Sequence, residues 1–159
     1  MKAVAFFEKT EKAKIEGVVL FDQCCPDHST SIQIKLRGLP PNSTNAIHIH
    51  EYGDLTGGCM STGGHFNPFN QPHGNYKIHG NKRHAGDLIN NINSNSRGEV
   101  VLSFEDELVD LFGKNSVIGR AVVIHSGRDD LGLGGNEQSL TTGNAGGRMA
   151  CAIIGIAKN

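Results

Sequence analysis

Residues 46–54 read AIHIHEYGD, and two histidines in this stretch alternate with two isoleucines. Successive side chains of a β-strand point to opposite faces, so His48 and His50 share one face and the two isoleucines share the other. One face therefore suits a hydrophobic core, and the other brings two imidazoles close enough to bind one metal ion. A surface strand with two histidines gives the same short pattern by chance, so the rest of the chain decides between the two interpretations.

Length and composition favour a single all-β domain without a nucleic-acid partner. The 159 residues suit one domain over positions 1–159 with a sizeable core. The 15 Lys and Arg residues balance 16 Asp and Glu residues, for a formal net charge of −1, whereas nucleic-acid binders usually carry a basic excess. The 21 glycines between short apolar runs are typical of turn-rich β proteins. The 8 histidines are the unusual feature.

The N-terminal stretch predicts a cytoplasmic protein with no membrane partner. Its apolar run ends before Glu8, which is too short for the core of a signal peptide, and no stretch approaches the roughly 18 apolar residues of a membrane span. A reducing compartment normally keeps thiols free, so a disulfide here needs an argument of its own. The cysteines are Cys24, Cys25, Cys59 and Cys151.

Short apolar runs separated by turn residues predict about eight strands and little helix. The clearest run is SIQIKLR at 31–37, in which apolar and polar side chains alternate. The polar residues around 10–14 and the NNINSNS run at 90–96 are expected to form turns or loops. Such a chain folds as an antiparallel barrel or sandwich with Greek-key connections. The expected strands are residues 3–7, 15–21, 31–37, 46–50, 84–89, 98–104, 118–125 and 149–157.

Two long segments, residues 51–83 and 126–147, show almost no periodicity and are rich in glycine and polar residues. A loop of this length inside a compact domain is usually either functional or disordered. The histidines and the cysteine of the first segment argue against disorder. We therefore expect two functional loops on a rigid β scaffold.

The histidines form two sets with the chemistry of metal ligands. One segment contains three imidazoles and one carboxylate, a donor set that matches a tetrahedral zinc site. Histidines from two strands add an all-nitrogen set, which suits Cu(II). Spacing alone leaves open that these are scattered surface histidines. The candidates are His65, His73, His84 and Asp87 for the first set, and His48, His50 and His125 for the second.

Six separated motifs in the same order make nearly the whole chain resemble the copper,zinc superoxide dismutases. This family has an immunoglobulin-like Greek-key β-sandwich fold, which agrees with the strand pattern. Motifs in this number and order are specific, and they disfavour scattered surface histidines. The motifs are HIHEYGD at 48–54, GC at 58–59, GHFNP at 64–68, HAGDL at 84–88, residues 118–125 followed by DDLG at 129–132, and GNAG at 143–146 followed by Arg148 and Cys151.

The resemblance implies a two-metal enzyme that dismutates superoxide to oxygen and hydrogen peroxide. Copper is then the redox-active ion, while zinc, which has no redox chemistry, holds the loop and tunes the bridging histidine. That bridge is His65, which binds both ions as an imidazolate and supplies a proton during turnover. The implied ligands are His48, His50, His65 and His125 for copper, and His65, His73, His84 and Asp87 for zinc.

The same resemblance implies roles for residues outside the ligand sets. Arg148 attracts and orients the superoxide anion, although the residue also fits an ordinary surface arginine. Asp129 links a copper histidine to a zinc histidine and fixes their orientation, with Asp130 as the rival. Cys59 and Cys151 form the family's intrasubunit disulfide, which joins the first long loop to the last strand.

Other residues depart from the family pattern. Cys24 and Cys25 match nothing in it and are expected to be free thiols in a turn. An insertion between His73 and His84 contains His79, which competes as a zinc ligand. We prefer His84, because the neighbours Gly-Asp that follow it match the family motif.

The apolar last strand, at residues 153–157, resembles the family's dimer contact together with Gly53 and residues 118–119. We therefore expect a two-fold homodimer. The alternative is that this strand is fully buried within one chain. A copper-loading chaperone is a further partner that such an enzyme can have.

Three rival functions compete with dismutation. The first is a copper chaperone or metal store of this fold. Chaperone domains that resemble the family tend to lack copper ligands and to carry an extra metal-binding domain, whereas every copper position is filled here. A zinc-only structural sandwich leaves the copper set and Arg148 unexplained. A hydrolytic zinc enzyme needs an open coordination position and a general base, and the sequence places no such base.

The second long loop predicts altered electrostatic steering of the substrate. Relatives commonly carry an acidic residue where Gln138 stands and a lysine where Thr141 stands, and charges there guide superoxide toward copper. We expect weaker or differently placed steering, with Lys82, Arg83 or Arg128 as compensating cations. The value of kcat/KM should therefore fall less steeply with ionic strength than in a relative that carries the lysine. An equally steep fall would contradict this expectation.

Overall fold

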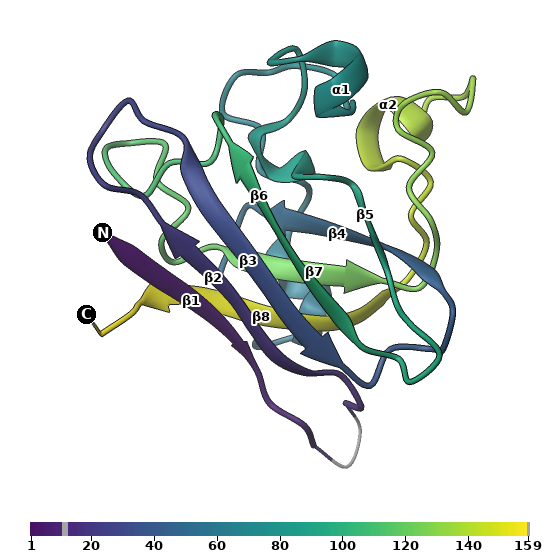
Figure 1. Cartoon of the computed structure of the whole chain (residues 1–159). Coiled ribbons are helices and arrows are strands. Elements are labelled where there is room, and N and C mark those ends of the chain that lie inside the picture. The colour runs from purple at the N-terminus through teal and green to yellow at the C-terminus, as the bar shows by residue number, and fades with distance from the viewer. Residues whose placement is uncertain (11–12, 159) are drawn as a thin grey trace.

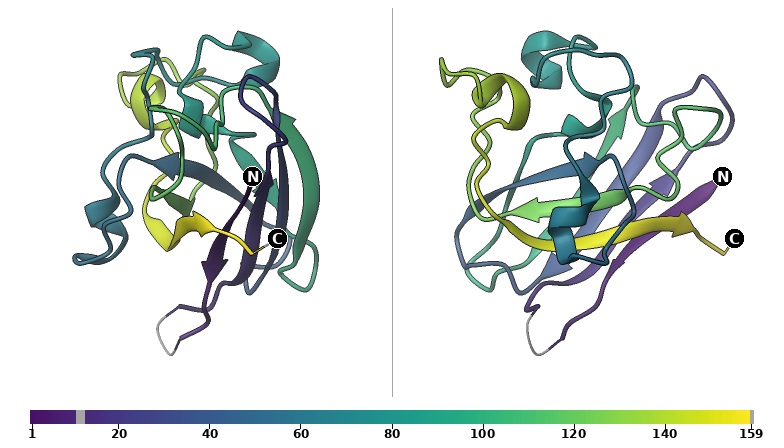
Figure 2. Two further views of the ribbon diagram at one scale, coloured as in Figure 1. Left: turned by 90° about the vertical axis from the view of Figure 1, so that its left-hand side faces the viewer. Right: turned by 180° about the vertical axis from the view of Figure 1, so that it is seen from behind.

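Eight antiparallel strands form one continuous sheet folded into two layers (Figures 1 and 2). The computed structural model describes residues 1–10 and 13–158. The strands are β1 (Lys2–Phe7), β2 (Glu16–Asp22), β3 (Thr30–Arg37), β4 (Thr44–His50), β5 (Asn91–Asn93), β6 (Val100–Asp106), β7 (Ala121–His125) and β8 (Arg148–Ile156). Their order in the sheet is β5-β4-β7-β8-β1-β2-β3-β6. Sheet neighbours such as β1 and β8 are far apart in sequence, which confirms the predicted all-β antiparallel fold with its Greek-key order.

The helical segments are short and belong to the long connections. One layer of the sheet holds β1, β2, β3 and β6, and the other holds β4, β7 and β8 (Figure 2), with β5 paired to the edge of β4. Within residues 1–10 and 13–158, no helix has the length and apolarity that crossing a membrane requires. The helical segments are η1 (Gly58–Thr62), α1 (Tyr76–His79), η2 (Ala85–Asp87) and α2 (Ser139–Thr142).

Strand β3 shows the expected period of two. Its side chains alternate strictly between buried and exposed along the whole strand. Ile32, Ile34 and Leu36 face inward and belong to the hydrophobic core, while the polar residues between them face solvent. A strand with one solvated face shows this pattern, so the interpretation of residues 31–37 is confirmed.

Strand β4 is buried on both faces, which the sequence pattern did not indicate. Ile47 and Ile49 lie in the hydrophobic core, as predicted. The opposite face carries His48 and His50, whose exposed fractions are 0% and 1%. Both histidines are therefore removed from water, although the face that carries them is polar.

Residues 84–89 were expected to form a strand, and that expectation is wrong. The structure has the 3-10 turn η2 there, followed by Leu88 with a positive φ of 50°. The side chain of Asp87 accepts hydrogen bonds from the backbone N–H groups of His84 and Gly74. These local bonds to a carboxylate replace a strand ladder. Gly86 is required because an added Cβ would lie 2.1 Å from the carbonyl oxygen of Ile49 in β4.

The NNINSNS run was expected to be a loop, but it contains the short strand β5. Residues 91–93 pair with β4 in antiparallel register, with Asn45 opposite Ile92. Ile92 is fully buried in the core. Asparagine disfavours strands, so this segment is held in the sheet by the burial of one side chain rather than by propensity.

The other predicted strands differ from the structure only near their ends. Strand β7 begins at Ala121 instead of residue 118, because Gly119 has a φ of 81° and turns the chain. The expected turn at residues 10–14 includes positions 11 and 12, which lie outside the described residues. On either side of them, the backbone N–H of Thr10 donates to the carbonyl of Ala13.

The first long loop, residues 51–83, is fixed to the scaffold by one covalent and one ionic contact. A disulfide joins Cys59 in η1 to Cys151 in β8 across 92 residues of sequence, as the family resemblance implied. Nη2 of Arg83 lies 2.8 Å from each carboxylate oxygen of Asp106, at the end of β6, and both side chains are buried. A buried pair of this kind tolerates little displacement, because a separated charge would be left without water or a partner.

Candidate metal centre

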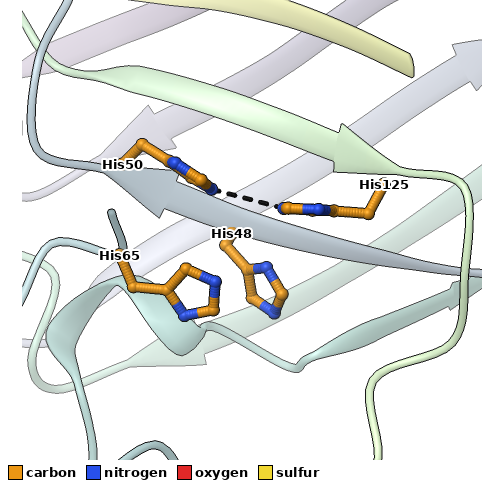
Figure 3. A group of neighbouring side chains, drawn as sticks. All are labelled: His48, His50, His65 and His125. Carbon is orange, nitrogen blue, oxygen red and sulfur yellow. Dashed lines mark hydrogen bonds between the residues drawn. The ribbon is translucent and has the colours of Figure 1, made fainter. Parts of the chain in front are cut away.

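Four buried histidines meet where β4, β7 and the first long loop come together (Figure 3). His48 and His50 project from one face of β4, and His125 ends β7. His65 follows η1 and forms an isolated backbone bridge with His50. Each ring offers a nitrogen, and these nitrogens all lie within 4.8 Å of one another. Folding thus assembles the predicted all-nitrogen set and adds His65 to it.

Backbone carbonyls fix the ring orientation of two of these histidines. Nδ1 of His50 donates to the carbonyl oxygen of Gly63 at 2.9 Å, and Nδ1 of His125 donates to that of Gly146 at 3.3 Å. A carbonyl only accepts, so the proton of each neutral ring is on Nδ1. The lone pairs on the Nε2 atoms of His50 and His125 then face each other at 3.3 Å. Two lone pairs at this distance repel unless a cation lies between them.

The other two rings of this cluster each carry a nitrogen without a partner. His48 Nδ1 and His65 Nε2 are buried and accept or donate no hydrogen bond within the part of the chain that the structure describes. Buried polar atoms are almost always paired. The opposite nitrogen of each ring is bonded to a carboxylate, so the unpaired atoms are those free to ligate. The donor set therefore fits a metal ion at this position.

Burial keeps this cluster uncharged. It lowers the pKa of His50 to about 2 and that of His125 to about 4. Burial also lowers the pKa values of His48 and His65, although hydrogen bonds to carboxylates oppose it. All four imidazoles are therefore neutral at neutral pH, the form in which histidine binds metals.

A second cluster is centred on the carboxylate of Asp87. Its Oδ1 atom lies 3.0 Å from Nδ1 of His65, 2.8 Å from Nδ1 of His73 and 3.1 Å from Nδ1 of His84. All four residues are buried. Three imidazole nitrogens and one carboxylate oxygen are the donor set of a four-coordinate zinc site. The segment from His65 to Asp87 therefore brings together the predicted set.

His73 holds a proton in the second cluster in the absence of a cation. Burial lowers its pKa, but hydrogen bonds from the ring to the carboxylates of Asp129 and Asp87 outweigh burial and raise the pKa to about 9. Burial raises the pKa of Asp87, yet hydrogen bonds from three histidines hold it well below the usual range. A divalent cation would replace this proton and satisfy the same carboxylate, so metal binding is coupled to proton release.

His65 belongs to both clusters. Its Nδ1 faces Asp87, and its Nε2 is the unpaired nitrogen of the four-histidine cluster. A neutral imidazole has one N–H and one lone pair, so binding a metal through both nitrogens requires loss of the ring proton. Two flanking cations favour that loss. The geometry therefore suits a bridge, and the assignment of the ligands remains a prediction.

Asp129 connects the clusters on their other side. Its Oδ2 lies 2.6 Å from Nε2 of His48, and its Oδ1 lies 2.9 Å from Nε2 of His73. The hydrogen bonds from these histidines keep the pKa of Asp129 below its usual range, although burial acts in the opposite direction. The rival Asp130 bonds instead to Gly132 and Ser139 within its own loop. The contacts thus favour Asp129 as the carboxylate that orients the ligands.

Two asparagines that the sequence analysis did not identify hold Asp129 in place. Nδ2 of Asn90 donates to its Oδ2 at 3.1 Å, and Nδ2 of Asn91 donates to its backbone carbonyl at 3.0 Å. Asn91 also accepts from the backbone N–H of Asp129. These residues begin the NNINSNS run, and only its position just after the Asp87 motif could have indicated this role.

His79 lies outside both clusters. Its Nδ1 accepts a hydrogen bond from the backbone N–H of Asn75 at the start of α1. His84 is the residue that approaches Asp87. The preference for His84 over His79 therefore agrees with the geometry.

A hollow of about 340 Å³ adjoins the four-histidine cluster. The guanidinium of Arg148 is held at its edge, with Nη1 2.8 Å from the carbonyl oxygen of Cys59 and Nη2 2.6 Å from that of Gly63. Burial lowers the pKa of Arg148, but a guanidinium stays charged at neutral pH. The lining includes His50, His65, His125, Arg148, Gln138 and Thr142.

Of the cations proposed to compensate for Gln138 and Thr141, one is excluded. Arg83 is 2% exposed and is paired with Asp106, so it cannot act on an approaching anion. Lys82 and Arg128 are exposed. Of the three candidates, Lys82 and Arg128 therefore stay able to compensate.

Fold and site together define an antiparallel β-barrel that carries two metal-ligand clusters joined by one histidine. The family model of copper/zinc superoxide dismutase (SODC) matches residues 15–154. The superoxide dismutase [Cu-Zn] of Candida glabrata is 47% identical over 156 residues, 98% of each chain. That of Schizosaccharomyces pombe is 47% identical over 145 residues, 91% of this chain and 92% of the relative.

A solved structure described as that of the clock protein EA4 superimposes with a TM-score of 0.88 at 41% identity, covering 98% of this chain and 94% of the other. The chain belongs to the copper/zinc superoxide dismutase family. The resemblance found in the sequence is thereby confirmed.

The substitution Asp129→Asn should weaken metal binding. The neighbouring substitution Asp130→Asn is the matched control and should leave metal binding unchanged. Asparagine keeps the size but removes the charge and one acceptor, so His48 and His73 lose the partner that orients them. We expect the affinity for zinc and copper to fall by about 10- to 100-fold. Competition against a chelator of known affinity measures this change. Equal affinity in Asp129→Asn and the unmodified protein would contradict the orienting role.

Proposed function

We propose that this protein dismutates superoxide, converting two superoxide anions and two protons into oxygen and hydrogen peroxide. The observation that carries the proposal is the single imidazole of His65, shared by an all-nitrogen cluster and a zinc-type cluster, beside a hollow edged by Arg148. Membership of the copper/zinc superoxide dismutase family supports the same reaction.

The free donor atoms support an assignment of ligands to each ion. The four-histidine cluster offers Nδ1 of His48 and Nε2 atoms of the other three rings, and the second cluster offers three Nδ1 atoms and one carboxylate oxygen. When bound, copper supplies one-electron redox chemistry, and zinc supplies charge without redox chemistry. The proposed ligands are His48, His50, His65 and His125 for copper, and His65, His73, His84 and Asp87 for zinc.

Arg148 is proposed to receive and orient the anion. Its guanidinium donates to Cys59, Thr62 and Gly63, so its position is set before substrate arrives. A fixed cation beside the hollow attracts superoxide and limits its orientations.

His65 is proposed to handle the proton that the product requires. Its Nδ1 is held toward Asp87, while its Nε2 faces the four-histidine cluster. The ring also lines the hollow. Nε2 is therefore the atom at which a proton can be held next to the substrate position.

We also propose that the protein forms a two-fold homodimer through β8 and the adjacent turns. Ile153 and Ile156 on β8 are 44% and 71% exposed, whereas Ile154 between them is buried. The alternative of a fully buried strand is therefore excluded. An added Cβ on Gly53 would lie 2.1 Å from the carbonyl oxygen of Gly119 and 3.2 Å from the side chain of Ile153, so these two turns pack closely beside the exposed Ile153. Sedimentation at micromolar concentration tests this proposal, and a sole 17.0 kDa species would refute it.

A cytoplasmic location and a copper-loading chaperone as partner stay predictions of the sequence analysis. Fractionation of the source cells would test the location, and recovery of the protein from another compartment would refute it. The copper content of protein expressed without any chaperone would test whether a chaperone is needed. Full loading would show that it is not.

The function is tested by loading metal-free protein with zinc alone and with zinc plus copper. Superoxide consumption should appear only in the second sample, because zinc has no redox chemistry. Metal analysis of both samples controls for occupancy. Bound copper without activity would contradict dismutation and leave a copper store as the function, whereas equal activity with zinc alone would exclude a copper enzyme.

Arg148→Ala should lower kcat/KM for superoxide by on the order of 10- to 100-fold, because the anion loses its positioned cation. Arg148→Lys keeps the charge but loses the planar fork, so its loss should be smaller. Arg97→Ala removes an exposed arginine that pairs with Glu99 and serves as the control. Copper and zinc contents should stay unchanged in all three. An unaltered kcat/KM in Arg148→Ala would refute the role.

A further inference from the structure

A third group of soft and nitrogen donors lies in the connection between β2 and β3. Cys24 and Cys25 are free cysteines, and with His28 they place one potential ligand atom each within 4.8 Å of one another. We propose that these three residues form an additional metal site at the protein surface that binds one copper(I) ion.

The distances show a cluster of free thiols rather than a disulfide. The sulfur atoms of Cys24 and Cys25 are 3.0 Å apart, compared with 2.05 Å for the bonded pair Cys59–Cys151. Nδ1 of His28 lies 3.3 Å from the sulfur of Cys25. Only small shifts of side chains at the surface are needed to bring all three donors around one ion.

Buried contacts hold the turn in the shape that gathers these donors. The side chain of Gln23 is 2% exposed, donates to the carbonyl of His28 at 2.7 Å and accepts from the backbone N–H of Leu111 at 2.7 Å. Asp27 has a φ of 63°, a left-handed conformation that aspartate tolerates better than most residues. This turn brings His28 back toward Cys25. Binding therefore needs little ordering of the chain.

The donor chemistry favours copper(I). Thiolates and imidazole are ligands that copper(I) and zinc both accept. Structural zinc sites, however, are almost always four-coordinate. The cluster found among the described residues contains only three ligand groups. Copper(I) is satisfied by two thiolates and one imidazole, whereas zinc would need a water molecule as a fourth ligand. Copper(I) therefore suits the site better than zinc does.

A redox-active cysteine explains this cluster less well. The hydrogen bond between the two thiols raises the pKa of Cys25, whereas reactive cysteines have a lowered pKa and an electropositive surrounding. A bound metal displaces thiol protons by direct coordination and needs no such activation.

The site is accessible and separate from the centre described above. Cys24 and His28 line a surface groove of about 600 Å³ together with Glu105 and Lys158. In Figure 1 the connection between β2 and β3 is at the upper left, whereas α2 of the second long loop is at the upper right. Copper(I) can therefore reach the three donors without passing the four-histidine cluster.

The test uses protein already loaded with copper and zinc, kept under anaerobic reducing conditions. Copper(I) is supplied as its coloured complex with a bathocuproine chelator, and loss of that colour counts the ions transferred. We expect one further equivalent, with a new thiolate-to-copper charge-transfer absorption. The clusters described above contain only nitrogen and oxygen donors, so this absorption identifies thiolate ligation.

Variants locate the site. The double variant Cys24→Ser/Cys25→Ser should bind copper(I) on the order of 100-fold or more weakly and lack the absorption, and His28→Gln should bind about 10-fold more weakly. Ser29→Ala alters the same turn without removing a ligand and should bind as the unmodified protein does. The double variant also detects any contribution of Cys59 and Cys151 released by the reductant. Equal uptake by the double variant, or ready displacement of copper(I) by equimolar zinc, would overturn the proposal.

Discussion

The two nitrogens of one imidazole ring, that of His65, constrain the rest of this structure. His65 directs Nδ1 to the carboxylate of Asp87 and leaves Nε2 unpaired among three other histidines. For one ring to serve both clusters, strand β4 must be buried on both faces, and the loop that follows η1 must pair with it at His50. On the opposite side, Asp129 accepts hydrogen bonds from His48 of one cluster and His73 of the other. The position of this ring therefore depends on β4, on both long loops and on the strand that carries His125.

Charge balance explains why a polar interior of this size is tolerated. Asp87 and Asp129 are both in contact with buried histidines, and their hydrogen bonds leave His73 protonated between these two carboxylates. The remaining rings stay neutral because burial disfavours their charged form. Replacing one proton by divalent cations strengthens the same contacts. Ions that bind only the folded chain also stabilise it, so folding and metal uptake are parts of one equilibrium.

Local sequence patterns predicted those parts of the fold that depend on local chemistry. Strand β3 alternates between buried and exposed side chains because one of its faces is solvated. His48 and His50 of β4 share a face because side chains two residues apart on any strand point the same way. Residues 84–89 were misassigned because their apolar residues resemble a strand, whereas bonds from the backbone to Asp87 impose a turn. Strand β5 and the roles of Asn90 and Asn91 depend on contacts with β4 and Asp129, segments distant in sequence. Residue type and position suggested the two ligand sets, but only the family resemblance implied that His65 belongs to both.

The disulfide between Cys59 and Cys151 does more than restrict the unfolded chain. Arg148 lies three positions before Cys151, and it donates to the carbonyl of Cys59 itself and to Gly63 nearby. The covalent link and the guanidinium thus clamp the same short segment against the start of β8. Reduction would break the Cys59–Cys151 bond, which includes no proposed ligand atom. The segment that carries the carbonyls of Cys59 and Gly63 would then be free to move away from the guanidinium of Arg148. The thiol redox state of the surroundings is therefore coupled to the positioning of the guanidinium that receives the anion.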